Sequence, residues 1–186
     1  MKRIKVRKTL GYDPTCGGRF SRYEGYDRIA LGLEDPGILA GQKKLVTGDV
    51  RVLCSPRKRA RDSVMGGKVE TTHLLDEVMF DLSELVGEEE YVRCGSNLVR
   101  RRFVKAFEND ELGEKRVEVK TRMERLLRRL KKEPGEVLLV SHSFFMKILE
   151  IYLSHKKLFE RPKILREYFN TDKKTYNFGE GFDFEL

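Results

Sequence analysis

Two short runs of apolar residues interrupt a chain that is otherwise rich in charge. Residues 50–54, VRVLC, and residues 137–140, VLLV, are almost continuously apolar, which predicts strands buried on both faces of a sheet. A third strand is predicted at residues 4–6, IKV, where apolar and polar positions alternate. All three runs are too short for a stable helix.

Apolar residues three and four positions apart predict helices between and after these strands. The predicted helices cover residues 35–46, 55–65, 97–108, 114–132 and 144–153. The first two helices each open with a capping residue and a proline, Asp35-Pro36 and Ser55-Pro56, which is a common way for a helix to begin. Residues 9–33 have little periodicity and predict a long loop.

Strands and helices that alternate along the chain predict the α/β class, in the form of a three-layer sandwich with a largely parallel central sheet flanked by helices. A length of 186 residues suits one hydrophobic core, so we expect residues 1–186 to form a single domain. Within it we expect residues 87–113 to be an insertion. Residues 170–186 end in an alternation of aromatic residues and predict a C-terminal tail or edge strand.

Composition narrows the expected partners and location. Charged residues make up 37% of the chain and the net charge is +8, which favours an anionic partner: a nucleic acid, a membrane surface or a phosphorylated small molecule. Cys16, Cys54 and Cys94 have no paired spacing and no metal motif is present, so we expect reduced thiols, no metal and no cofactor. No run approaches the roughly 20 apolar residues of a membrane span, and no apolar segment follows the basic N-terminus. We expect a cytoplasmic protein; the oligomeric state has no signal in the sequence.

Charged and polar residues follow three of the predicted strands. Arg7 and Lys8 follow the first strand, residues 55–59 follow the second, and His142 follows the strand at 137–140. Because the carboxyl ends of parallel strands share one edge of a sheet, where ligands bind, we expect these residues to lie close together. Cations beside an imidazole and helix N-termini suit a phosphate dianion. The sequence therefore predicts a site for a phosphoryl group.

Four segments resemble the histidine phosphatase superfamily, also called phosphoglycerate mutase-like. SPRKRARDS is similar to the family's S-P-x-x-R-A-x-x-T, which implies that Arg59 binds phosphate, and VLLVSHSFFMKIL is similar to V-x-x-V-S-H-G, which implies that His142 is the second histidine. LLDEVMFDLSEL resembles L-x-E-x-x-F-G-x-x-E-G and implies that Glu77 is the proton donor, although Asp81 and Leu85 replace two glycines. EDPGILAGQKKLV is similar to the family's D-x-P-L-T-x-x-G-x-x-Q-A.

The resemblance covers residues 4 to about 153 and departs from the family at the nucleophile. The family's first strand ends in Arg-His-Gly, whose histidine accepts the phosphoryl group, whereas VRKT has Arg7 at the arginine and Lys8 at the histidine. An imidazole is largely unprotonated near neutral pH, but an ammonium has no lone pair to offer. The resemblance thus implies phosphate binding by Arg7, Lys8, Arg59 and His142, with His142, Glu77 and Lys8 as catalytic candidates.

Three functions are compatible with these residues. We favour a phosphate-ester-binding protein of the histidine phosphatase fold, with impaired or absent phosphomonoesterase activity and a phosphorylated small molecule as partner. The second is an active phosphatase with Lys8 or His142 as an unusual nucleophile. The third is a basic nucleic-acid-associated protein in which the pocket is vestigial.

Other charged residues have simpler interpretations. Arg57, Lys58 and Arg61 are expected on the surface, and residues 100–102 on exposed helix faces with their alkyl stems over apolar neighbours. Residues 16–22, CGGRFSR, match the cysteine–arginine spacing of a cysteine-dependent phosphatase loop, but no buried strand precedes them. We interpret that match as chance.

Overall fold

A five-stranded sheet forms the centre of the computed structural model, which describes residues 2–10, 23–31, 33–35, 37–38, 41–173 and 175–186. Its strand order is β5-β3-β6-β1-β7, with β1 at Arg3–Lys8, β3 at Arg51–Cys54, β5 at Lys68–Thr71, β6 at Val137–Ser141 and β7 at Gly181–Glu185. The first four strands in this order run parallel, and β7 pairs antiparallel with β1 at one edge. The predicted largely parallel sheet is confirmed.

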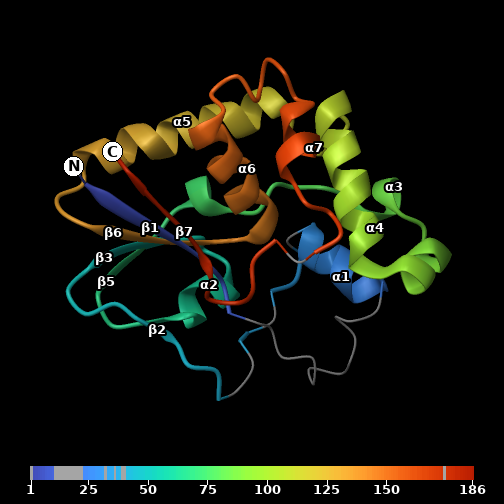
Figure 1. The fold of residues 1–186 in the computed structure, drawn as a ribbon. Coiled ribbons are helices and arrows are strands. Elements are labelled where there is room, and N and C mark those ends of the chain that lie inside the picture. Colours follow the sequence, from blue (N-terminus) through green and yellow to red (C-terminus); the bar gives the residue numbers. More distant parts are fainter. Residues whose placement is uncertain (1, 11–22, 32, 36, 39–40, 174) are drawn as a thin grey trace.

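Helices cover both faces of this sheet. They are α1 (Tyr23–Ala30), α2 (Lys58–Asp62), α3 (Leu82–Leu85), α4 (Glu88–Asn109), α5 (Arg116–Lys132), α6 (Ser143–Ser154) and α7 (Ile164–Tyr168). Figure 1 shows α5 and α6 above the sheet and α2 below it, with α1, α3, α4 and α7 grouped beyond one end. The three-layer α/β arrangement predicted from the sequence is therefore present.

Alternation of side chains along the strands builds a core on each face of the sheet. One set of buried strand residues packs with α5 and α6: Ile4, Val6, Leu53, Val137 and Leu139. The other set packs with Ala60 of α2 on the opposite face: Val52, Cys54, Leu138 and Val140. Because both faces are covered, β3 and β6 are apolar at nearly every position, as the sequence shows.

In the residues that the structure describes, one expected helix is absent and another is shorter than expected. The helix expected over residues 35–46 does not form: residues 42–44 lack regular structure, and Leu45–Val46 is a short strand, β2, paired with β4 at Val64–Met65. The same pairing ends α2 at Asp62, before residue 65. Asp35, expected to cap the missing helix, accepts instead from the backbone N–H of Arg59 in α2.

Several elements were not expected from the pattern, among them α1, β5 and α7. The segment interpreted as a long loop, 9–33, contains α1, while residues 11–22, including all of CGGRFSR, lie outside the described part of the chain. Strand β5 has four exposed residues, so no apolar run marks it. Helix α7 has one buried residue, Leu165, and is too short for a periodic signal.

Candidate functional site

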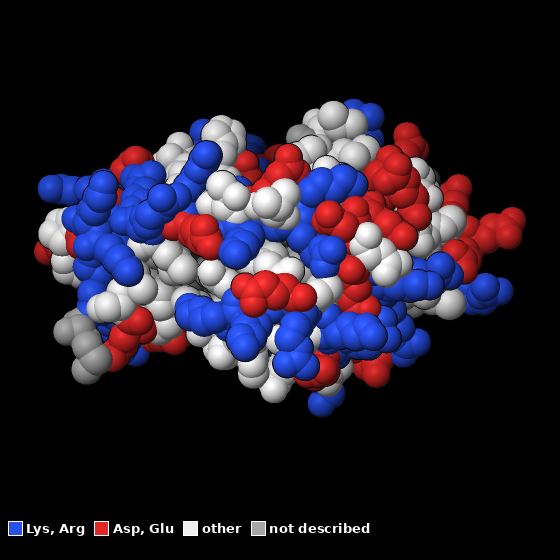
Figure 2. Space-filling model, turned by 90° about the horizontal axis from the view of Figure 1, so that it is seen from above, with Lys and Arg blue, Asp and Glu red and all other residues white. Residues whose placement is uncertain are grey.

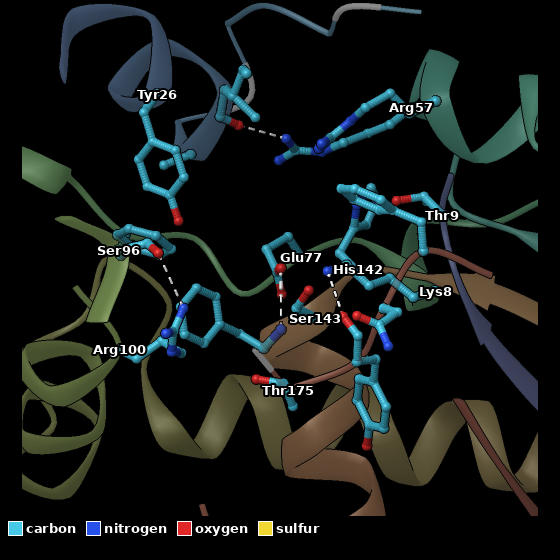
Figure 3. A pocket seen from close by; sticks show the side chains of 18 of the residues that line it. Lys8, Thr9, Tyr26, Arg57, Glu77, Ser96, Arg100, His142, Ser143 and Thr175 are labelled. Carbon is cyan, nitrogen blue, oxygen red and sulfur yellow. Dashed lines mark hydrogen bonds between the residues drawn. The ribbon is translucent and has the colours of Figure 1, made fainter. Parts of the chain in front are cut away.

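A cavity of about 400 Å³ lies at the carboxyl ends of β1, β3 and β6, with further walls from α1, α4 and the segment before β7. Figure 3 shows its side chains converging from these elements. Among the described residues that line it, the cations are Lys8, Arg57, Arg59 and Arg100, and the carboxylate is Glu77. This excess of positive charge in a concave site favours an anionic ligand.

The alternation of β1 directs Lys8 into this cavity. Lys8 shares the face of Ile4 and Val6, both fully buried, and register pairs it with Ser141, the residue before His142. Its Nζ donates to the backbone carbonyl of Tyr176, in the segment before β7, at 3.0 Å. The same Nζ lies 4.8 Å from the centroid of the Phe178 ring. Both contacts favour a charged ammonium.

Arg7 points to the opposite face of the sheet. Its Nη1 donates to Oδ1 of Asp183 in β7 at 2.7 Å and to the carbonyl of Phe182 at 3.1 Å. Arg7 is not among the residues that line the cavity. The structure therefore brings Lys8 but not Arg7 to the site, in contrast to the expected convergence of both, because neighbouring strand residues face opposite ways.

His142 lies at the turn from β6 into α6, where it is only 3% exposed. Burial holds its pKa well below the ordinary value, and the nearby charges of Arg59, Arg57 and Lys8 lower the pKa further. Its buried Nε2 has no hydrogen-bond partner among the residues that the structure describes. A buried ring nitrogen without a partner is costly, so His142 is suited to a ligand atom in the cavity.

We expect His142 to make the folded protein less stable as the pH is lowered. In the unfolded chain the imidazole takes up a proton below about pH 6.5, whereas the folded protein keeps it neutral to lower pH. The free energy of unfolding should therefore decrease as pH falls through this range, by up to about 1.4 kcal/mol per pH unit from this group. Urea unfolding of the wild type and of His142→Asn at about pH 7.5 and about pH 5.5, without phosphate, measures the difference; equal decreases would contradict the expected burial.

Arg59 is anchored by an ion pair inside the cavity wall. Its Nε lies 3.1 Å from Oδ1 of Asp35, and the two side chains are 12% and 18% exposed. Burial lowers the pKa of the guanidinium, and Asp35 opposes that shift. A guanidinium remains charged throughout the neutral range. Asp35 thus orients a cation that lies against the cavity.

Arg57, two residues earlier, also lines the cavity, which corrects its expected place on the surface. Its Nη1 donates to the carbonyl of Ile29 in α1 at 2.7 Å. The contact joins α2 to α1 across the cavity wall. Lys58 is the more exposed neighbour, and it pairs with Asp62 along the same helix.

Glu77 accepts backbone hydrogen bonds at the start of α6. Its Oε1 accepts from the N–H of Phe145 at 2.7 Å and its Oε2 from the N–H of Phe144 at 3.2 Å. Burial raises the pKa of this carboxyl, and the backbone donors oppose the rise. A general acid needs such a raised pKa, which the acidic sequence around Glu77 does not suggest. Its role as proton donor stays a prediction.

Arg100 is a site residue that the sequence analysis missed. It lines the cavity and is 9% exposed, whereas it was expected on an exposed helix face. In α4, Arg100 lies on the same face as the buried Phe103, Val104 and Phe107, which follow it by three, four and seven residues. That spacing is the sequence signal that could have indicated its burial.

No group of three or more His, Cys, Asp or Glu side chains that could hold a metal ion occurs in the described part of the chain. Within the same residues, no helix is both long enough and apolar enough to cross a membrane.

The fold and the cavity residues agree with a family model. The model of the histidine phosphatase superfamily (branch 1) matches residues 39–168, so the chain belongs to this superfamily. The matched range contains Arg59, Glu77 and His142 and begins after Lys8. No curated protein matches the chain significantly.

Several solved structures are similar to this chain. A phosphoserine phosphatase mutant from Entamoeba histolytica, in complex with phosphoserine, is 16% identical over 91% of this chain and 86% of that one, with a TM-score of 0.46. A protein proposed as an α-ribazole-5′-P phosphatase from Escherichia coli is 17% identical over 82% and 80%, with a TM-score of 0.47. A phosphoglycerate mutase from Bacillus anthracis is 13% identical over 84% and 81%, with a TM-score of 0.44.

Proposed function

We propose that the chain binds a phosphorylated small molecule through its phosphoryl group, and that its phosphomonoesterase activity is impaired or absent. The observation that carries the proposal is the convergence of Lys8, Arg59 and His142 on one cavity. Arg59 and Lys8 supply fixed positive charge. The Nε2 of His142, without a partner in the described part of the chain, supplies a hydrogen bond. Arg57 adds a further cation at the same wall.

Impaired turnover follows from the chemistry of Lys8. In the family's route a histidine nitrogen attacks phosphorus with its lone pair, and the leaving oxygen departs as the bond to nitrogen forms. The carbonyl and the Phe178 ring around Lys8 favour an ammonium, which has no lone pair. The same ammonium binds a phosphate dianion well, so the pocket holds its ligand and lacks the usual attacking group.

An active enzyme is the alternative, with His142 as its nucleophile. The low pKa of His142 leaves an unprotonated nitrogen at neutral pH. In this route a His142 nitrogen would form a bond to phosphorus, the ester oxygen would leave with a proton from Glu77, and water would later hydrolyse the phosphohistidine. The raised pKa of Glu77 supports its part in this alternative.

A basic surface keeps nucleic acid as a second candidate partner. Figure 2 shows Lys and Arg gathered toward one end of the upper face, over the C-terminal half of α5, with acidic side chains more frequent toward the other end. Arg125, Arg128, Lys131 and Lys132 of α5 are exposed there. Binding by such a patch would weaken steeply as salt concentration rises, because counterions are released from the nucleic acid.

Two measurements on the wild type test the proposal. Calorimetry should detect one saturable orthophosphate site, and p-nitrophenyl phosphate should be turned over slowly or not at all. Efficient turnover that requires His142 would replace the proposal with the unusual-nucleophile alternative. Absence of orthophosphate binding, together with salt-sensitive binding of a short DNA duplex, would favour the nucleic-acid alternative.

A further inference from the structure

The cavity extends beyond the residues assigned to the phosphoryl group, and Arg100 lies in that extension. Figure 3 shows Arg100 and Lys8 on opposite sides of Glu77 and His142. Arg100 comes from α4, whereas Lys8 comes from the end of β1. The cavity therefore has positive charge at two separate places along its wall.

Arg100 carries a buried charge without an acidic partner in the described part of the chain. Its Nε donates to the carbonyl of Thr171 at 2.9 Å, its Nη1 donates to Oγ of Ser96 at 3.2 Å, and its Nη2 donates to Oδ1 of Asn97. All three acceptors are neutral. The carboxylate of Asp172, which opposes the lowering of the pKa of Arg100, accepts a hydrogen bond from the exposed Arg101 at 2.5 Å.

A guanidinium has five N–H donors, so these three bonds leave two for another acceptor. Burial lowers the pKa of Arg100, which reflects the cost of removing its charge from water. In folded proteins a buried cation is normally paired with an anion, since an unpaired charge away from water is strongly unfavourable. The open cavity against which Arg100 lies is where that anion can be placed.

Aromatic side chains form a share of the cavity wall. Tyr26, Phe80, Tyr91 and Phe144 are among the residues that line the cavity. Phe80 and Phe144 pack edge to face with ring centroids 5.5 Å apart. The ring centroids of Tyr26 and Tyr91 are 5.7 Å apart. Such walls favour a flat or apolar portion of a ligand.

We propose that Arg100, held by Ser96 and Asn97, is a second anion subsite, so that the ligand is an organic phosphate whose flat or apolar portion ends in a second anionic group. This inference rests on the proposed phosphoryl site. The second anion accepts the two remaining N–H groups of Arg100 while the phosphoryl group lies at Arg59, Lys8 and His142. Ser96 and Asn97 are positioning residues, because they contact the guanidinium.

Phosphonates that cannot be hydrolysed test the subsite independently of turnover. Calorimetry on the wild type compares phenylphosphonate with its 4-carboxy, 4-carbamoyl and 4-phosphono derivatives. The carboxy compound should bind about 10-fold or more tightly than the neutral carbamoyl compound, the gain typical of a charge-assisted hydrogen bond. The phosphono compound shows whether a carboxylate or a phosphate fits better; no preference for either anion would overturn the subsite.

Variants assign the preference to Arg100. Arg100→Gln should abolish the preference for the second anion while leaving the affinity for phenylphosphonate unchanged within about twofold. Arg101→Gln, an exposed neighbour on the same helix, should keep the preference. A preference that survives in Arg100→Gln would overturn the proposal. If that variant does not fold, Arg100→Lys should retain only part of the preference, because lysine keeps the charge but lacks the paired N–H donors of the guanidinium.

The outcomes separate this inference from the function on which it rests. If phenylphosphonate binds and Arg59→Ala weakens it, but the second anion adds nothing, the phosphoryl site stands and the Arg100 subsite fails. If phenylphosphonate does not bind the wild type, the phosphoryl site fails and the Arg100 proposal fails with it.

Discussion

Lys8→His should create or strongly increase phosphomonoesterase activity, on the order of 10²-fold or more with p-nitrophenyl phosphate. The substitution puts an imidazole, with a lone pair at neutral pH, at the end of β1 beside Arg59 and His142. Initial rates at saturating substrate measure the gain.

Two further variants make this result specific. Lys5→His introduces the same residue on the opposite face of the same strand, where Lys5 pairs with Glu136, and should leave activity at the wild-type level. The double variant Lys8→His with Arg59→Ala should lose the new activity. If Lys8→His changes nothing while its fold and orthophosphate affinity are intact, position 8 is not the nucleophile position and the impaired-enzyme account is wrong.

Arg59→Ala should weaken orthophosphate binding by about 10- to 100-fold, the range expected when a charged hydrogen-bond partner is removed from a buried site. Arg59 is the cation that the family pattern and the cavity geometry both select. Calorimetric titration with orthophosphate at constant ionic strength measures the change, and an unchanged dissociation constant would remove Arg59 from the binding site.

Removing Arg59 alone also leaves the carboxylate of Asp35 buried without its partner, which destabilises the fold. The double variant Arg59→Ala with Asp35→Ala avoids that charge and should recover stability without recovering phosphate affinity. Arg61→Ala is the matched control, since Arg61 is an exposed arginine of the same short helix. Its titration should match the wild type.

The sheet and three of the residues that line the cavity, Lys8, Arg59 and His142, were predictable from local pattern. Buried strands at β3 and β6 are marked by apolar runs, and the residues after them, Arg59 and His142, share an edge because parallel strands share their direction. The alternation of side chains along a strand could also have predicted that Arg7 does not face the cavity. Ile4 and Val6 face the core, so period-two alternation sends Lys8 inward and Arg7 outward.

Other features depend on contacts that the pattern does not contain. Strand β5 is exposed at every position, and only pairing with β3 makes it a strand. Asp35 is a residue type that often caps helices. The backbone N–H that it accepts from belongs to Arg59 of α2, which is distant in sequence. Arg100 shares the face of Phe103 and Phe107 in α4, but its place at the cavity depends on where that helix packs.

A crystal structure with vanadate bound tests the central claim most directly. The account predicts one tetrahedral or trigonal oxyanion in the cavity, with Arg59, His142 Nε2 and Lys8 Nζ each within hydrogen-bond distance of its oxygens. Vanadate bound elsewhere, or an ordered cavity in which Lys8 and His142 share no anion at saturating vanadate, would contradict it.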